Sequence, residues 1–140
     1  MAEWVLFALG SAVFAGLTAV LAKVGVEAIA SNVATLIRTV VVLAFVALLI
    51  SLRREWPYVG QLTPRSALWL ALSGLTTGLS WLCYYRALQG GPASLVAPLD
   101  KLSVVVVILL AAVALGERLS AVQWTGAFLM TIGAVLLVTK

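Results

Sequence analysis

The sequence predicts an all-α integral membrane protein with five transmembrane helices in a single membrane domain, residues 1–140. Hydrophobic residues make up 64% of the chain and charged residues 10%, and the mean hydropathy is +1.17. A soluble domain is about half apolar and about a quarter charged. The apolar residues form runs of about 20, the length that crosses a bilayer core as a helix. None of the runs alternates apolar with polar residues as a membrane β-strand would. The predicted spans are residues 3–22, 32–52, 66–88, 94–115 and 120–139.

The first two spans are separated by a short polar segment. The opening "MAEWVLFALG" has no basic stretch before its apolar core and no small-residue cleavage site after it, so we expect it to stay as a span. Its helix is expected to continue toward Ala30. The second span ends at "RREWPYVGQLTPR", where Pro57, Gly60 and Pro64 predict a turn.

The last three spans are bounded by glycine, proline and charge. The third ends before Gly90-Gly91-Pro92, and the fourth ends at "GER" before the fifth begins. Pro98 falls in the first turn of the fourth span. A proline there either starts the helix or loosens it, because it has no backbone N–H to donate. Loosened backbone at membrane depth is tolerated where it lines a cavity.

Five crossings place the two ends of the chain on opposite sides of the membrane. We call the side of the N-terminus face A and the opposite side face B. Bases in the loops at face A would make it cytoplasmic by the positive-inside rule, but bases near face B almost cancel that bias. The face A bases are Arg53, Arg54, Arg65 and Arg118, and the face B bases are Lys23, Arg38, Arg86, Lys101 and Lys140.

Six charged residues collect in the half of the spans nearest face B, and we call this predicted region the vestibule. They are Lys23, Glu27, Arg38, Arg86, Asp100 and Lys101. At ~1.5 Å per residue, Arg38 and Asp100 lie ~9 Å below the surface, where a charge is costly. The bases could instead extend to the headgroups, with the acids only neutralising them. For Arg38, Asp100 and Lys101 the depth favours solute binding.

The charge balance of the vestibule favours an anionic or zwitterionic solute. Glu27 and Asp100 are candidates for proton coupling only because they are its carboxylates. Asp100 and Lys101 are neighbours, and side chains that pair on a helix are three or four residues apart. We therefore expect each to face a different partner, with Arg38 or Arg86 as the partner of Asp100.

Aromatic residues form a stripe on the third span that leads toward face B. Trp81 and Tyr84 are candidate solute contacts, because an aromatic wall suits a solute with an apolar or cationic part. An interfacial anchor explains Tyr84 and Tyr85 equally well. On the fifth span, Gly126 and Gly133 lie on one helix face and predict a close helix contact, our candidate dimer interface.

The composition argues against an enzyme. The chain has no histidine and one cysteine, Cys83, so serine–histidine chemistry, HExxH zinc sites and CxxC sites are excluded. Asp100 has no deep carboxylate beside it for aspartyl chemistry. No cofactor, metal or nucleic-acid partner is predicted.

A longer pattern covers the end of the third span through the fifth. The stretch "YYRALQGGPASLVAPLDKLSVVVVILLAAVALGERLSAVQWTGAFLMTIGAVLLV" resembles a single EamA domain of the drug/metabolite transporter superfamily. The "DKLS" after "APL" is similar to the short five-span bacterial and archaeal branch. The resemblance implies one half of an inverted-repeat transporter fold, in the plasma (inner) membrane of a bacterium or archaeon, that moves a small solute by alternating access.

A five-span chain must find its inverted partner in a second chain. The weak charge bias permits insertion in both orientations, and we expect an antiparallel homodimer. The alternative is a membrane scaffold or an accessory subunit of another transporter. Short chains and small-residue helix faces fit that alternative, but charges in four spans do not.

Overall fold

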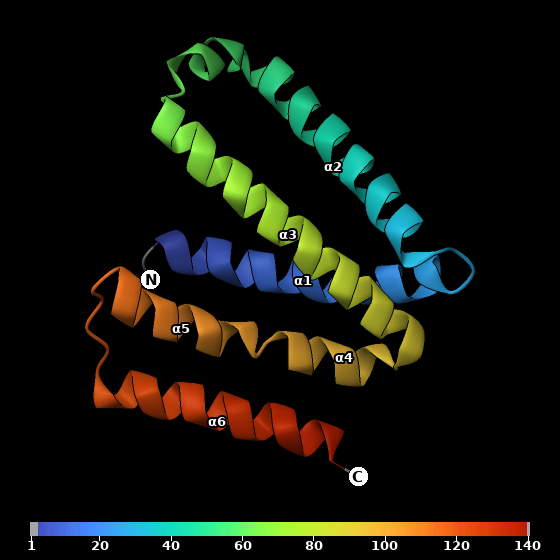
Figure 1. Cartoon of the computed structure of the whole chain (residues 1–140), viewed down its shortest axis with the longest axis vertical. Helices are drawn as coiled ribbons and strands as arrows, with labels where there is room; N and C mark the ends of the chain where they lie inside the picture. The colour runs from blue at the N-terminus through green and yellow to red at the C-terminus, as the bar shows by residue number, and fades with distance from the viewer. Residues whose placement is uncertain (1–2, 140) are drawn as a thin grey trace. The chain divides into compact units, whose positions relative to one another are not determined.

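The computed structural model describes residues 3–139 and contains no β-strand within them. Those residues form six α-helices and one 3-10 helix (Figure 1). The elements are α1 (Glu3–Val26), α2 (Ser31–Arg53), η1 (Trp56–Gln61), α3 (Pro64–Gly90), α4 (Ala93–Asp100), α5 (Ser103–Ala114) and α6 (Ala121–Val138). Lys140, one of the face B bases, lies outside the described residues.

Five of these segments are long and apolar enough to cross a bilayer, which confirms the all-α membrane fold class. They are Glu3–Val26, Ser31–Arg53, Pro64–Gly90, Ala93–Ala114 and Ala121–Val138. Their large side chains are mostly exposed: Phe7 is 79% and Val113 86% accessible. Apolar surface on this scale is unfavourable in water and is stable against lipid chains.

The chain folds as two compact units. One contains the residues up to Leu21 and those from Gly91 onward, and the other is Ala22–Gly90.

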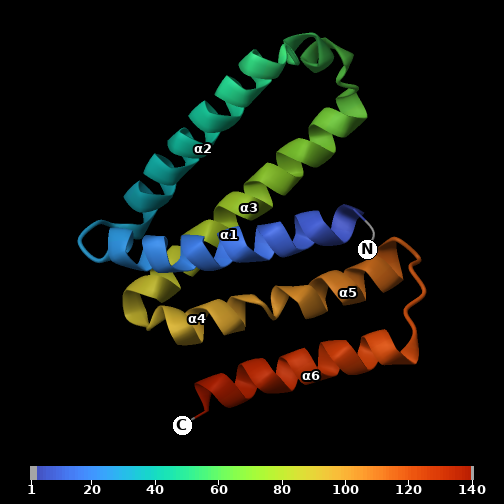
Figure 2. The ribbon, with the colours of Figure 1, turned by 180° about the vertical axis from the view of Figure 1, so that it is seen from behind.

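Unit 22–90 is built on a helical hairpin of α2 and α3, which run antiparallel beside each other (Figures 1 and 2). Arg54 ends α2 in the left-handed conformation, with φ of 56°, and its N–H bonds the carbonyl of Ser51. The predicted turn residues lie in the connection: Pro57 is at the start of η1 and Pro64 is the first residue of α3. The Thr63 hydroxyl accepts from the Ser66 N–H at 3.2 Å and caps α3.

The first helix is shorter than expected. α1 ends at Val26, and residues 27–30 form a turn before α2 begins at Ser31. The expectation that the helix continues toward Ala30 is therefore wrong. The carbonyls of Val26 and Ile29 are satisfied by a side chain of α3, so the chain can reverse direction there without leaving these two carbonyls unsatisfied.

In the other unit, the segment expected as one continuous helix is interrupted. α4 ends at Asp100 and α5 begins at Ser103. Pro98 lies inside α4 and cannot donate to the carbonyl four residues before it. After it the backbone tightens into bonds three residues apart, from Leu102 to Leu99 at 3.0 Å and from Val104 to Lys101 at 3.0 Å. The loosening expected at Pro98 therefore falls one turn later, in the middle of the span.

α6 packs against α4 and α5 through small residues (Figures 1 and 2). It starts with a capping box formed by Ser120 and Gln123. Ala127 and Ala134, seven residues apart, are both buried. Gly126 and Gly133 point elsewhere: a Cβ added at either would meet nothing within 4 Å among the described residues.

Candidate functional site

The strongest polar contacts of unit 22–90 join the C-terminal ends of α1 and α3. Lys23, in the last turn of α1, donates from Nζ to the carbonyl oxygen of Leu88 at 2.7 Å. In a continuing helix this carbonyl would accept from the residue four positions on, which is Pro92 and has no N–H. Lys23 supplies the missing donor, and its positive charge lies at the negative end of the α3 dipole.

The contact is reciprocated by Gln89. Its Nε2 donates to the carbonyl oxygens of Ile29, at 2.7 Å, and of Val26, at 3.2 Å. Each helix therefore caps the other: α1 provides a lysine for α3, and α3 provides an amide for α1. We call this pair of contacts the reciprocal cap. It gives Lys23 a structural role, and its placement in the vestibule stays a prediction.

Arg38 lies against the aromatic face of α3. Its guanidinium carbon is 4.0 Å from the ring centroid of Trp81 and 5.7 Å from that of Tyr85. Its Nη1 donates to the Tyr85 hydroxyl at 3.2 Å. Trp81 and Tyr85 are one helical turn apart, so both rings face α2. A cation–π contact of this kind stabilises by about 2 kcal/mol when it is shielded from water.

Arg38 has no carboxylate partner within its own unit. Glu27 and Glu55 are the acids of residues 22–90, and within that range neither forms a salt bridge with Arg38. The Arg38 charge is therefore held by aromatic faces and a phenol. Within residues 22–90 no carboxylate compensates this charge, and an arginine in that condition can hold an anion.

The two other vestibule residues of this unit lie at its surface. Glu27 is exposed in the turn after α1, and Lys23, four residues earlier, is bonded to Leu88. Arg86 is also exposed, with a 3.5 Å contact from Nη1 to the Gln89 amide oxygen. Neither Glu27 nor Arg86 forms a salt bridge within residues 22–90.

Tyr85 and Gln89 were not among the site residues predicted from the sequence. Tyr84 was chosen instead, and its half-buried ring lies beside that of Tyr85, with centroids 6.4 Å apart. The spacing of Trp81, Tyr85 and Gln89 at i, i+4 and i+8 places them on one helix face. That spacing could have identified Tyr85 and Gln89 from the sequence, because a deeply placed arginine such as Arg38 needs a partner on a facing helix.

Asp100 and Lys101 lie in the other unit, at the break between α4 and α5. Lys101 Nζ is 3.9 Å from Asp100 Oδ2, and the two side chains are 55% and 38% exposed. The prediction that these neighbours cannot face each other is wrong. It assumed a continuous helix, whereas Lys101 lies outside α4, in the break, where the helical spacing rule no longer holds. A pair this long and this exposed is weak.

No group of three or more histidine, cysteine, aspartate or glutamate residues that could hold a metal ion occurs within residues 3–139.

Taken together, five apolar helices, polar groups satisfied at helix ends and a broken helix within a span define a multi-pass membrane protein. The chain belongs to the EamA-like transporter family, whose model matches residues 2–139. It is similar to a protein of a Sinorhizobium species named "uncharacterized transporter in cobO 3′ region", with 51% identity over 135 residues that cover 96% of each chain. No solved structure matches it significantly. The protein is thus a membrane transporter, and its family implies a small-molecule solute.

The reciprocal cap predicts that Gln89→Leu destabilises the protein. Its loss leaves the carbonyls of Val26 and Ile29 without their donor, so we expect a cost of about 1 kcal/mol. Thermal unfolding of the purified protein in detergent measures this cost. The matched control is Gln61→Leu, in the exposed η1, which should change stability by less than about 0.5 kcal/mol. Equal effects of the two substitutions would contradict the capping role.

Proposed function

We propose that the protein carries a small anionic or zwitterionic solute across the plasma membrane of a bacterium or archaeon by alternating access, as an antiparallel homodimer. The observation that carries the choice of solute is Arg38, held over Trp81 and against Tyr85 with no carboxylate beside it in its unit. The bacterial relative supports the localisation.

The geometry of Arg38 suits recognition of a carboxylate or phosphate. The guanidinium carbon lies over the Trp81 ring, 4.0 Å from its centroid, which is a cation–π contact. One N–H bonds Tyr85, of the five that the group carries. The remaining donors lie in the plane of the group, the geometry in which arginine binds planar oxyanions with two parallel bonds.

The aromatic partners add a second element of recognition. Trp81 and Tyr84 are half-buried, so part of each ring is accessible to a solute held by Arg38. An apolar or ring-shaped part of the solute would lie against them. A lone inorganic anion would leave these contacts unused, which favours an organic anion or zwitterion.

Asp100 and Lys101 are the second pair of polar residues proposed to contact the transported solute. The helix is interrupted around them, and interrupted helices within a span are found where the span lines a cavity. The pair is zwitterionic and complements a zwitterionic solute. Asp100 is also a candidate proton carrier, as is Glu27, because both are exposed or half-exposed carboxylates in this half of the spans.

The antiparallel arrangement follows from the number of spans. Five crossings give one chain a vestibule on face B only, so a second, inverted copy would supply the vestibule on face A. Gly126 and Gly133 lie seven residues apart on one face of α6 and are the proposed contact for a partner helix; within their own unit no described atom would meet a Cβ added at either. Close approach of helix backbones at such a face is favourable in lipid.

Substituting Arg38 should remove solute binding. A thermal-shift screen of anionic, zwitterionic and cationic small molecules on the purified protein should find stabilising compounds among the first two classes. Arg38→Gln should weaken their binding by about tenfold or more, because a charge-assisted bond is lost.

The matched control for Arg38 is Arg53→Gln, which removes an exposed arginine from the other end of the same helix. It should retain the binding. Stabilisation by cations alone, or equal binding in wild type and Arg38→Gln, would refute the proposed solute class.

Removing the Asp100–Lys101 pair should abolish transport while the fold persists. The double substitution Asp100→Asn with Lys101→Gln should stop uptake of the screened solute into proteoliposomes and leave the unfolding temperature close to that of the wild type, because the pair is weak and exposed.

A second adjacent acid–base pair serves as its control. Glu117→Gln with Arg118→Gln alters the exposed connection between α5 and α6 and should transport normally. Wild-type uptake by the Asp100/Lys101 double variant would exclude the pair from the path.

The antiparallel homodimer predicts that the chain inserts in both orientations. In a Cys83→Ser background, a cysteine at Gln61 should react with a membrane-impermeant maleimide in about half of the chains in intact cells, and in all of them after permeabilisation. Labelling of none or all of the chains before permeabilisation would rule out dual insertion. A single orientation would direct attention to a different inverted partner or to the accessory-subunit function.

A further inference from the structure

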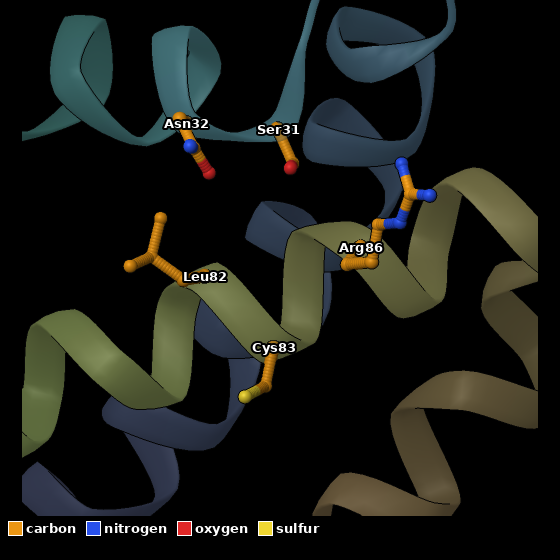
Figure 3. Close-up of a pocket in the computed structure, with 5 residues that line it drawn as sticks. All are labelled: Ser31, Asn32, Leu82, Cys83 and Arg86. Atoms are coloured by element: carbon orange, nitrogen blue, oxygen red, sulfur yellow. The ribbon is translucent and has the colours of Figure 1, made fainter.

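An open hollow lies between the first turn of α2 and the C-terminal part of α3. It has a volume of about 470 Å³ and is lined by Ser31, Asn32, Leu82, Cys83 and Arg86. Figure 3 shows Ser31 and Asn32 directed from α2 toward α3, with Leu82 directed toward Asn32 and the Arg86 guanidinium at the other end. Cys83 points to the opposite side of α3.

The polar groups of the hollow have few partners within the protein. The Ser31 hydroxyl and the Asn32 amide have no hydrogen bond to any of the residues 3–139. Arg86 makes only the 3.5 Å contact with Gln89 and no salt bridge in its unit. No carboxylate lines the hollow. A cation and two neutral polar groups therefore face the same space with no negative charge among them.

The hollow lies at the boundary between headgroups and hydrocarbon. Ser31 is the first residue of a span, and Arg86 is four residues from the end of the next one, ~6 Å along the helix. Leu82 lies one turn deeper than Arg86. Below it the exposed Leu36 and Leu79 continue one apolar track along α2 and α3, because they are four and three residues from Asn32 and Leu82.

We propose that this hollow binds an anionic phospholipid, with the headgroup phosphate on Arg86, Ser31 and Asn32 and an acyl chain along Leu82, Leu36 and Leu79. A polar end at the surface and an apolar track below it match an amphiphile better than a soluble anion. Basic pockets between spans are a recognised form of anionic-lipid site. A zwitterionic lipid fits less well, because the hollow offers no carboxylate for its cationic group.

Purified protein in a neutral detergent tests the lipid site without any knowledge of the transported solute. Mixed micelles containing phosphatidylglycerol should raise the unfolding temperature, and micelles containing phosphatidylcholine should raise it less. In Arg86→Gln, half-saturation should require about tenfold more phosphatidylglycerol. Arg86→Lys keeps the charge as a point donor to phosphate and should bind more tightly than Arg86→Gln.

Two controls decide whether the effect belongs to this site. Arg53→Gln removes the same charge from the opposite end of α2 and should respond to phosphatidylglycerol as the wild type does. An equal loss in both glutamine variants would mean diffuse electrostatic attraction and overturn the proposal. Inorganic phosphate alone should not reproduce the stabilisation. If it does so through Arg86, the hollow is a site for a soluble anion and the lipid proposal is wrong.

Discussion

Backbone N–H and carbonyl groups in lipid must find their hydrogen-bond partners within the protein. In unit 22–90 the structure depends most on how this is achieved for the carbonyl of Leu88. Pro92 removes the donor that a longer helix would have provided. Lys23 replaces it at 2.7 Å, and Gln89 returns the contact by bonding the carbonyls at the end of α1. The end of α3 is bonded to the end of α1 and to the turn that follows α1, and each of these contacts joins residues at least 60 positions apart in the chain. The reciprocal cap therefore fixes this end of the unit. The alternative, a helix-end carbonyl without its donor, costs about 1 kcal/mol or more.

The same end of α3 provides the aromatic rings that hold Arg38. Once Gln89 fixes the rotation of the helix about its axis, Trp81 and Tyr85 face α2, because they lie eight and four residues earlier, respectively, on the same side. The position of Arg38 is therefore a consequence of how the helix ends are capped. A membrane-buried arginine is costly unless its charge is met, and two rings and a phenol meet it only in part. What remains of that charge is the basis of the proposed solute site.

In the other unit a proline has the opposite effect. At Pro92 a missing N–H is compensated by a side chain, whereas at Pro98 it is followed by a change of backbone geometry that separates α4 from α5. The break leaves Asp100 and Lys101 beside each other at the level where the helix changes. α6 packs on this interrupted pair of helices through alanines and leaves its glycines open. A capped helix end is thus associated with Arg38 in unit 22–90, and a broken helix is associated with Asp100 and Lys101 in the other unit.

The sequence by itself determined the class of the protein and the number of its spans, because burial in lipid depends on the composition and length of each segment and hardly on its neighbours. It also placed the turns at Pro57 and Pro64. It selected Arg38 and Trp81, although it did not bring them together. The tertiary structure decided where Lys23 binds, that Tyr85 contacts Arg38, that α1 ends at Val26, and that Asp100 and Lys101 pair. Those outcomes depend on the rotation of each helix and on the register between segments far apart in the chain, and hydropathy does not encode either.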